Sequence, residues 1–116
     1  MRTVQDSLSG RPVIEVSIDD GDILEALKKL GVKRMAVFDP ESITYAYPEK
    51  ADVADLRSFA SSALAIIGAA EPWLALKQGS RAVIIYKMSE KTVVIEGEFN
   101  PADYDAVVML SRLLVK

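Results

Sequence analysis

The least polar part of the chain lies in the second half of a long predicted helix, residues 51–76. Acidic, basic and serine side chains give its first turns a polar face, but residues 63–70 (ALAIIGAA) contain no polar side chain. A surface helix of a globular domain normally keeps one polar face. A helix that is apolar all round must be covered all round, and one sheet covers only one side. The other side therefore needs either a second layer of the same chain or another subunit.

Cover by another subunit predicts a contact surface on this helix. Pro72 lacks an amide donor and clashes with the preceding turn, so we expect it to kink or stop the helix near Ala70. Trp73, the only tryptophan, is either an anchor for a partner, as Trp often is at interfaces, or a lid on the protein's own core. The predicted interface consists of apolar residues, namely Phe59, Ala63, Ile66, Ile67, Ala70 and Trp73.

Alternating apolar and polar positions elsewhere in the chain predict strands. Residues 12–18 (PVIEVSI) alternate after Pro12, which a strand tolerates at its start. Two hairpins are also predicted, one from residues 32–39 and 42–47 with a turn at 39–42, the other from residues 82–88 and 92–99 with a turn at 89–91.

Helical spacing and capping residues predict two shorter helices. One begins in the Asp-rich segment 19–22 and ends before Gly31, and the other follows Asn100 and runs to the last residue. The fold class is then α+β, with an antiparallel β-sheet of about five strands sandwiched by the long central helix and two shorter helices. The sheet would comprise the two hairpins and the strand at 12–18. We expect residues 1–11 to be a flexible arm and residues 12–116 to be a single domain.

Composition narrows the classes of function. The 116 residues carry 14 Lys and Arg against 17 Asp and Glu, and this net charge of -3 argues against a dedicated nucleic-acid binder. The chain has no His and no Cys, so it lacks the commonest general base, the commonest transition-metal ligand and any thiol. The apolar run 63–76 is shorter than the ~20 residues that span a bilayer, and no signal peptide is recognisable. We expect a soluble, cytoplasmic protein without cofactor or metal, and its scarcity of Asn and Gln resembles thermophile proteins.

Acidic residues provide two candidate sites. Asp19, Asp20 and Asp22 could bind a hard cation, although capping of the helix that follows explains them more simply. Glu96 and Glu98 lie two apart on a strand and face the same side, so they could perform acid–base chemistry. The simpler interpretation places them on the solvent side of an edge strand. The glycine between them indicates a bulge or a close approach of another backbone.

Serine and basic residues provide two further candidates. Three serines on the long helix have no His to activate them and are interpreted as small residues that allow close helix packing: Ser58, Ser61 and Ser62. A basic patch where the first helix meets the first hairpin could meet an acidic partner or a phosphate, or could be a solvated rim: Lys28, Lys29, Lys33 and Arg34.

The order of the predicted elements resembles the Roadblock/LC7 family. The matching segments are the short helix 22–30, the strand 31–39, the return strand 43–47, the long helix 51–70 and the closing helix 101–116. The resemblance rests on the order and length of these elements. It implies a non-catalytic, dimerising domain that regulates or scaffolds small GTPases and motor complexes.

The same resemblance implies how two copies would meet. In dimers of the family the two sheets join edge to edge and the long helices pack against each other, which would cover the apolar residues 63–70. The family usually has three strands between the long helix and the last helix, whereas the pattern here predicts two. Either the strand at 12–18 fills the vacant edge of the sheet, or residues 82–88 form the exposed edge.

Three functional hypotheses follow. The preferred one is a non-enzymatic homodimer that binds a protein partner such as a small GTPase. The alternative is a small-molecule sensor with a pocket between sheet and helix, lined by Tyr45, Tyr47 and Tyr86. The third is an enzyme that uses Glu96 and Glu98.

Overall fold

A computed structural model of the chain describes the backbone of residues 2–6, 11–15, 17–68 and 72–115, and the side chains of 17–68 and 72–115. Three α-helices and one short 3₁₀ turn occur in these ranges: α1 (Asp20–Leu30), α2 (Ala54–Ile67), η1 (Pro101–Asp103) and α3 (Tyr104–Leu114). The strands are β1 (Arg2–Asp6), β2 (Arg11–Glu15), β3 (Val32–Phe38), β4 (Ile43–Tyr47), β5 (Leu74–Gln78), β6 (Arg81–Met88) and β7 (Lys91–Gly97).

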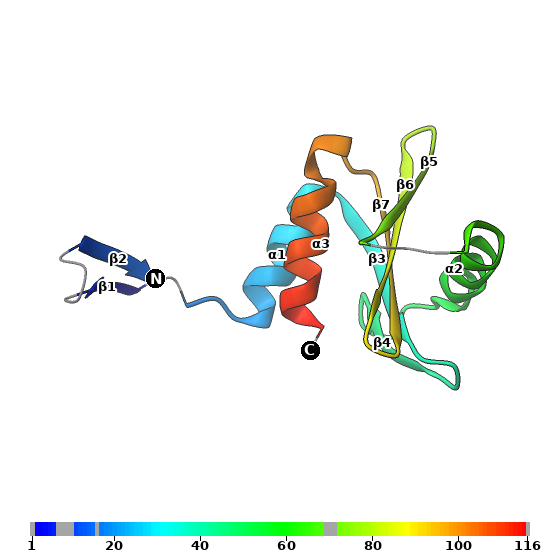
Figure 1. The fold of residues 1–116 in the computed structure, drawn as a ribbon, viewed down its shortest axis with the longest axis horizontal. Helices are drawn as coiled ribbons and strands as arrows, with labels where there is room; N and C mark the ends of the chain where they lie inside the picture. The colour runs from blue at the N-terminus through cyan, green and yellow to red at the C-terminus, as the bar shows by residue number, and fades with distance from the viewer. Residues whose placement is uncertain (1, 7–10, 16, 69–71, 116) are drawn as a thin grey trace.

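Five of these strands form one antiparallel sheet in the order β4-β3-β7-β6-β5. Helices α1 and α3 cover one face of this sheet, and α2 covers the other (Figure 1). The predicted α+β class and the five-stranded antiparallel sheet with three helices are therefore confirmed. The two predicted hairpins are confirmed as β3–β4 and β6–β7.

The membership of the sheet differs from the prediction at one edge. The fifth strand is β5, in a stretch that we interpreted as the end of the long helix and a short turn. The predicted strand at 12–18 corresponds to β2, which pairs with β1 in a separate two-stranded sheet. This hairpin lies apart from the rest of the molecule in Figure 1, and it includes part of the predicted arm 1–11. Three strands, not two, thus separate α2 from α3.

Helix α1 begins and ends as its sequence predicts. The Asp19 carboxylate accepts a hydrogen bond from the Asp22 amide at 2.9 Å, and the Asp22 carboxylate accepts one from the Asp19 amide at 3.2 Å. This reciprocal capping box satisfies amides that have no partner inside the helix. At the other end Gly31 adopts the left-handed conformation, with φ 111°. A Cβ at Gly31 or at Gly97 would collide with the backbone of the opposite segment, so the predicted close approach at Gly97 is confirmed.

Helix α2 is shorter than predicted. It ends at Ile67 because Gly68 adopts the left-handed conformation, with φ 89°, and its amide donates to the Leu64 carbonyl. The prediction that Pro72 stops the helix near Ala70 was therefore wrong, since the glycine ends it earlier. Ala70 itself lies outside the described residues.

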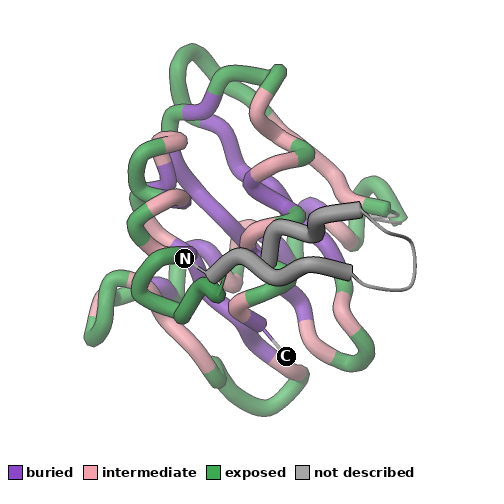
Figure 2. The backbone as a smooth tube through the Cα atoms, turned by 90° about the vertical axis from the view of Figure 1, so that its left-hand side faces the viewer, coloured by how far each residue is buried: buried purple, intermediate pink, exposed green. Residues whose placement is uncertain are grey.

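The sheet separates two cores, and buried backbone runs along its strands in Figure 2. Among the described residues, fourteen are buried in the core between the sheet and α1 and α3, including Leu27, Met35 and Tyr86. The core between the sheet and α2 contains nine, including Leu56 and Ala60. One helix therefore covers a smaller core on one face than two helices cover on the other.

Candidate functional site

No described residue covers the side of α2 that faces away from the sheet, and this side becomes apolar toward the C-terminal end. Ile66 is 85 % exposed and Ile67 is 49 % exposed. The remaining exposed positions of the outer side carry mostly small residues, which are Ala54, Ser58, Ser61, Ser62 and Ala65. Small residues allow the axis of another helix to approach closely, because interaxial distance depends on side-chain size.

One flank of α2 meets the edge strand β5 of the sheet. Strand β5 is the last strand of the sheet and pairs only with β6, so its other edge has no partner strand within the described residues. Phe59 of α2 and Leu76 of β5 line the same hollow of about 220 Å³. The guanidinium of Arg81 lies 5.6 Å from the centre of the Phe59 ring. We call the outer side of α2 together with the free edge of β5 the α2–β5 surface.

The predicted interface residues do not lie together in the structure. Ile66, Ile67 and the half-buried Phe59 lie on or beside the α2–β5 surface. Ala63 does not, because it faces the sheet and is 8 % exposed within the protein's own core. Trp73 lies on the opposite face of the sheet, where its ring meets that of Tyr104 edge-on at 5.9 Å. Ala63 and Trp73 therefore lie apart from Ile66, and the predicted interface itself stays a prediction.

Glu96 lies at the centre of an ionic network under the N-terminal end of α2. Nε of Arg34 donates to one carboxylate oxygen of Glu96 at 2.7 Å, and Nε of Arg81 donates to the other at 2.7 Å. The two terminal nitrogens of Arg34 also donate to both oxygens of Asp55, each at 2.8 Å. Arg34 thus ties β3 to β7 and to α2 at the same time.

The predicted solvent-side position of Glu96 on an edge strand was wrong. Strand β7 lies between β3 and β6, and Glu96 is 8 % exposed. The Arg34 and Arg81 guanidiniums hold the pKa of the Glu96 carboxyl below its usual value, and Arg34 does the same for Asp55. Glu96 is therefore held ionised as a bridge between two cations.

The two candidate catalytic carboxylates do share one hollow. Glu96 and Glu98 line an open space of about 180 Å³. Glu98 is paired with the ammonium of Lys33 at 3.3 Å and accepts a hydrogen bond from the Ser80 hydroxyl, also at 3.3 Å. Each carboxylate is therefore engaged by a cation, which favours a structural role over proton transfer.

The residues of the predicted basic patch also lie apart in the structure. Lys28 and Lys29 are exposed in the last turn of α1, whereas Arg34 is bound to Asp55 and Glu96 on the other face of the sheet. Asp19 and Asp22 cap α1, as the simpler interpretation predicted, and Asp20 lies in its first turn. No group of three or more acidic side chains is arranged to hold a metal ion within 17–68 and 72–115.

The three tyrosines of the predicted pocket are separated. Tyr45 and Tyr47 line an open hollow of about 560 Å³ beside Leu24 of α1. Tyr86 is fully buried, and its hydroxyl lies 2.6 Å from that of Ser111. Because the Ser111 hydroxyl donates to the Val108 carbonyl at 2.8 Å, it accepts from Tyr86. Burial also raises the pKa of Tyr86. Including Tyr86 in the pocket was therefore wrong.

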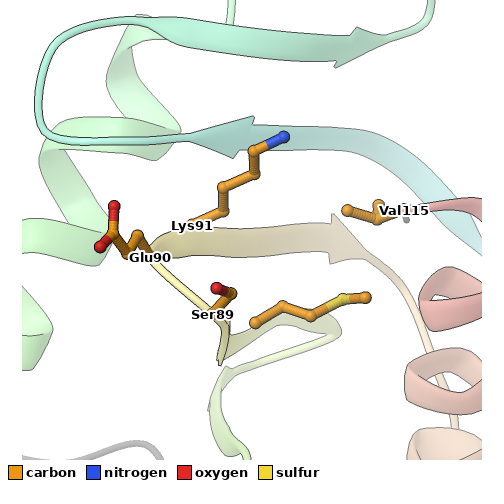
Figure 3. Close-up of a pocket in the computed structure, with 5 residues that line it drawn as sticks. Ser89, Glu90, Lys91 and Val115 are labelled. Atoms are coloured by element: carbon orange, nitrogen blue, oxygen red, sulfur yellow. The ribbon is translucent and has the colours of Figure 1, made fainter.

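A further hollow of about 370 Å³ lies at the β6–β7 turn, next to the end of α3. Ser89, Glu90 and Lys91 of the turn line it together with Val115 (Figure 3). It carries one acidic and one basic side chain, which point away from each other in Figure 3. The hollow therefore offers neither a concentrated charge nor a group of cooperating polar side chains.

Strand β5 is the part of the α2–β5 surface that sequence reasoning missed. Its side chains alternate, with Leu74 and Leu76 toward the α2 core and Ala75 toward the other core. A two-residue Gly-Ser loop joins Gln78 to Arg81, and Gly79 has φ 62°. Gly-Ser between two apolar runs is a known hairpin signal, and it would have identified the strand.

The function is argued from this geometry, because two comparisons with known proteins find no match. A scan against protein-family models finds no matching family, and a search of curated proteins finds no similar sequence. Within the described ranges, every helix is too short or too polar to cross a lipid bilayer.

Proposed function

We propose that the protein is a non-catalytic, homodimeric interaction module, similar to the Roadblock/LC7 regulators and scaffolds of small GTPases. One observation carries this proposal: the outer side of α2 exposes Ile66 to 85 %, and β5, which shares a hollow with Phe59 of α2, has no second partner strand within the described residues. A second copy that met this surface about a two-fold axis would cover both features. The free amides and carbonyls of β5 would pair, and the small outer residues of α2 would pack against their equivalents.

The arrangement of elements supports the resemblance on which the partner class depends. The family usually has three strands between its long helix and its last helix, and β5, β6 and β7 occupy this interval here. The departure from the family pattern that the sequence indicated is therefore absent. Edge-to-edge joining of two sheets also requires a free edge near the long helix, and β5 provides it.

Association through this surface should be sensitive to one side chain. Full burial of an Ile side chain contributes about 1.5–3 kcal/mol. Ile66→Asp would instead place a carboxylate at the contact, while the isolated protomer, in which this position is exposed, should keep its stability. We expect the parent protein to sediment at about twice its chain mass of 12.7 kDa, and the variant at the chain mass.

A matched pair of variants makes this test specific. Glu25→Ala changes an exposed residue of α1, on the other face of the sheet, and should leave the dimer intact. Ala63→Glu, by contrast, buries a charge in the α2 core and should unfold the protein. Sedimentation of the parent protein as a monomer at micromolar concentration would contradict the proposal.

The small-GTPase partner is the part of the proposal that depends on the family resemblance alone. Titration calorimetry with purified small GTPases from the same organism, loaded with either GDP or GTP, tests it. We expect one GTPase to bind the dimer and to bind the Ile66→Asp monomer less tightly. If none of them binds, the proposed GTPase partner is excluded, and the proposed dimer is not affected.

A small-molecule sensor is the second candidate, favoured by the hollow beside α1 and β4. Its volume of about 560 Å³ is within the range of ligand sites, and Tyr45 and Tyr47 supply aromatic surface. A thermal-shift screen against metabolites tests this function, with Tyr47→Ala as the control variant. A hit that the control abolishes would support it, whereas a screen without hits would eliminate it.

A further inference from the structure

Helix α3 carries a second exposed apolar stripe, on the face of the sheet opposite α2. Met109 is 58 % exposed and Leu113 is 45 % exposed. Beside them a groove of about 320 Å³ runs between α3 and the segment Pro72–Trp73. A dimer formed through the α2–β5 surface would not cover this stripe, because the sheet lies between α2 and α3 (Figure 1).

Two opposite charges flank the stripe. Asp105 and Arg112 are both exposed and line the groove, one near each end of α3. They are seven residues apart, or about 10 Å along a helix axis. Neither is in an ion pair within 17–68 and 72–115. The Arg112 guanidinium also lies over the Tyr86 ring, with its central carbon 5.2 Å from the ring centre.

The order of these residues makes the stripe complementary to itself. The midpoint between Asp105 and Arg112 falls between Val108 and Met109. If a second α3 is laid antiparallel across the first with the two-fold axis at this midpoint, each Asp105 faces the Arg112 of the other copy. Leu113 of each copy then lies near Tyr104 of the other. Trp73 is close to that end of α3, since its ring contacts Tyr104.

We propose that a second copy of this chain docks on α3 through a two-fold contact centred between Val108 and Met109. Two Asp105–Arg112 ion pairs fix its register, and Leu113 of each copy packs at the Pro72–Trp73 end of the groove of the other. Parallel packing of the same helices would place like charges together, so the charges select the antiparallel arrangement.

This contact is independent of the α2–β5 surface and goes beyond the proposed dimer. A protein with two different two-fold contacts on opposite faces assembles past the dimer, either into a closed tetramer or into an open chain. Helix α3 has 11 residues, and a pair of such helices buries less area than a standard stable interface. The association through α3 is therefore the weaker step, and it depends on concentration and on salt.

Charge reversal tests the inference by sedimentation velocity over a wide range of concentration. Asp105→Arg gives a stripe with two positive charges, and Arg112→Asp gives one with two negative charges. Either variant alone should weaken the higher association step at least about tenfold, because like charges then face each other. An equimolar mixture of the two variants should restore it, and so should the double variant. Both positions are exposed, so all variants should remain folded by circular dichroism. Because Asp105 lies in the first turn of α3 and Arg112 in the last, each reversal should lower the melting temperature by several degrees at most through the helix dipole.

The same experiment in the Ile66→Asp background separates the two interfaces. That variant should still form a dimer at high concentration, now through α3, and this dimer should disappear when Asp105→Arg is added. Variants that sediment like the parent at every concentration, or a mixture that does not restore association, would overturn the inference and leave the α2–β5 dimer standing. If only the α3 variants change the assembly and Ile66→Asp changes nothing, the proposed function fails and the α3 contact remains.

Discussion

The two faces of the sheet are covered in different ways. On one face α1 and α3 enclose fourteen buried residues, and Tyr86 and Ser111 make a hydrogen bond inside this core. On the other face the single helix α2 encloses nine, and the ionic network of Glu96 stands where apolar packing ends. The difference shows that ion pairs hold part of α2 on the sheet, whereas its outer side is exposed to solvent.

This comparison explains why the long helix has an apolar end. A single helix lying on a five-stranded sheet has one side toward the sheet and one side away from it. On the α1–α3 face the neighbouring helix supplies lateral cover, but α2 has no such neighbour in the described protomer (Figure 1). The exposed Ile66 is therefore a property of the single-helix layer, and a second copy of the layer is the simplest cover.

Among the variants that should still fold, the largest expected loss of stability comes from removing the ionic anchor of the α2 face. Glu96→Ala leaves Arg34 and Arg81 without their shared carboxylate, and we expect a loss of about 3 kcal/mol in the free energy of unfolding. This value is at the lower end for a broken buried pair, because both arginines keep partial access to water. Chemical denaturation measures it.

Glu98→Ala is the matched control for that variant. Its carboxylate also binds a cation, but the side chain is 53 % exposed, so the expected loss is at most about 1 kcal/mol. Equal losses for the two variants would mean that the network around Glu96 does not anchor α2.

The α1–α3 face should respond to a pair of smaller changes. Ser111→Ala leaves the buried Tyr86 hydroxyl without an acceptor and should cost about 2 kcal/mol. Tyr86→Phe should cost only about 1 kcal/mol, because the Ser111 hydroxyl still donates to Val108. Thermal or chemical unfolding of both variants gives the comparison, and a larger loss for Tyr86→Phe would contradict this assignment of the hydrogen bond.

The last of these predictions concerns the loss of folding stability in acid. This loss is smallest near neutral pH, and it should arise on the α2 face. The pKa of Glu96 is lower in the folded protein than its ordinary 4.5, mainly because Arg34 donates to it. The unfolded chain then takes up the proton first. The stabilisation is therefore complete above pH 4.5 and is lost as pH falls through the folded pKa. Unfolding of the parent and of Glu96→Gln below pH 4.5 should show a shallower acid loss in the variant, and parallel slopes would refute this source.

Local signals in the sequence were sufficient for much of the fold. The capping aspartates and Gly31 predicted both ends of α1, and the β-branched runs at 82–88 and 92–99 predicted β6 and β7. The prediction failed where two local sequence signals competed. Gly68 ended α2 before Pro72 could, and the short apolar run of β5 could not be told from helix by its period alone.

The candidate site was predicted only in part, for a different physical reason. An exposed end of the long helix followed from its composition, and Ile66 was among the predicted residues. The partners of Glu96 did not follow, because Arg34 is 62 residues away in the chain and meets it only after the sheet has formed. The position of Trp73 likewise could not be predicted, because it depends on the face of the sheet toward which the segment before β5 turns.

Hydrogen exchange of the two sheet edges, measured by mass spectrometry, tests the central claim most directly. The backbone of β5 should exchange slowly in the parent protein and faster in Ile66→Asp at the same concentration, because the second copy no longer pairs with it. The opposite edge, β4, provides an internal control and should exchange equally in both proteins. Equal exchange of β5 in the parent and in Ile66→Asp would contradict the claim that a second copy covers the α2–β5 surface.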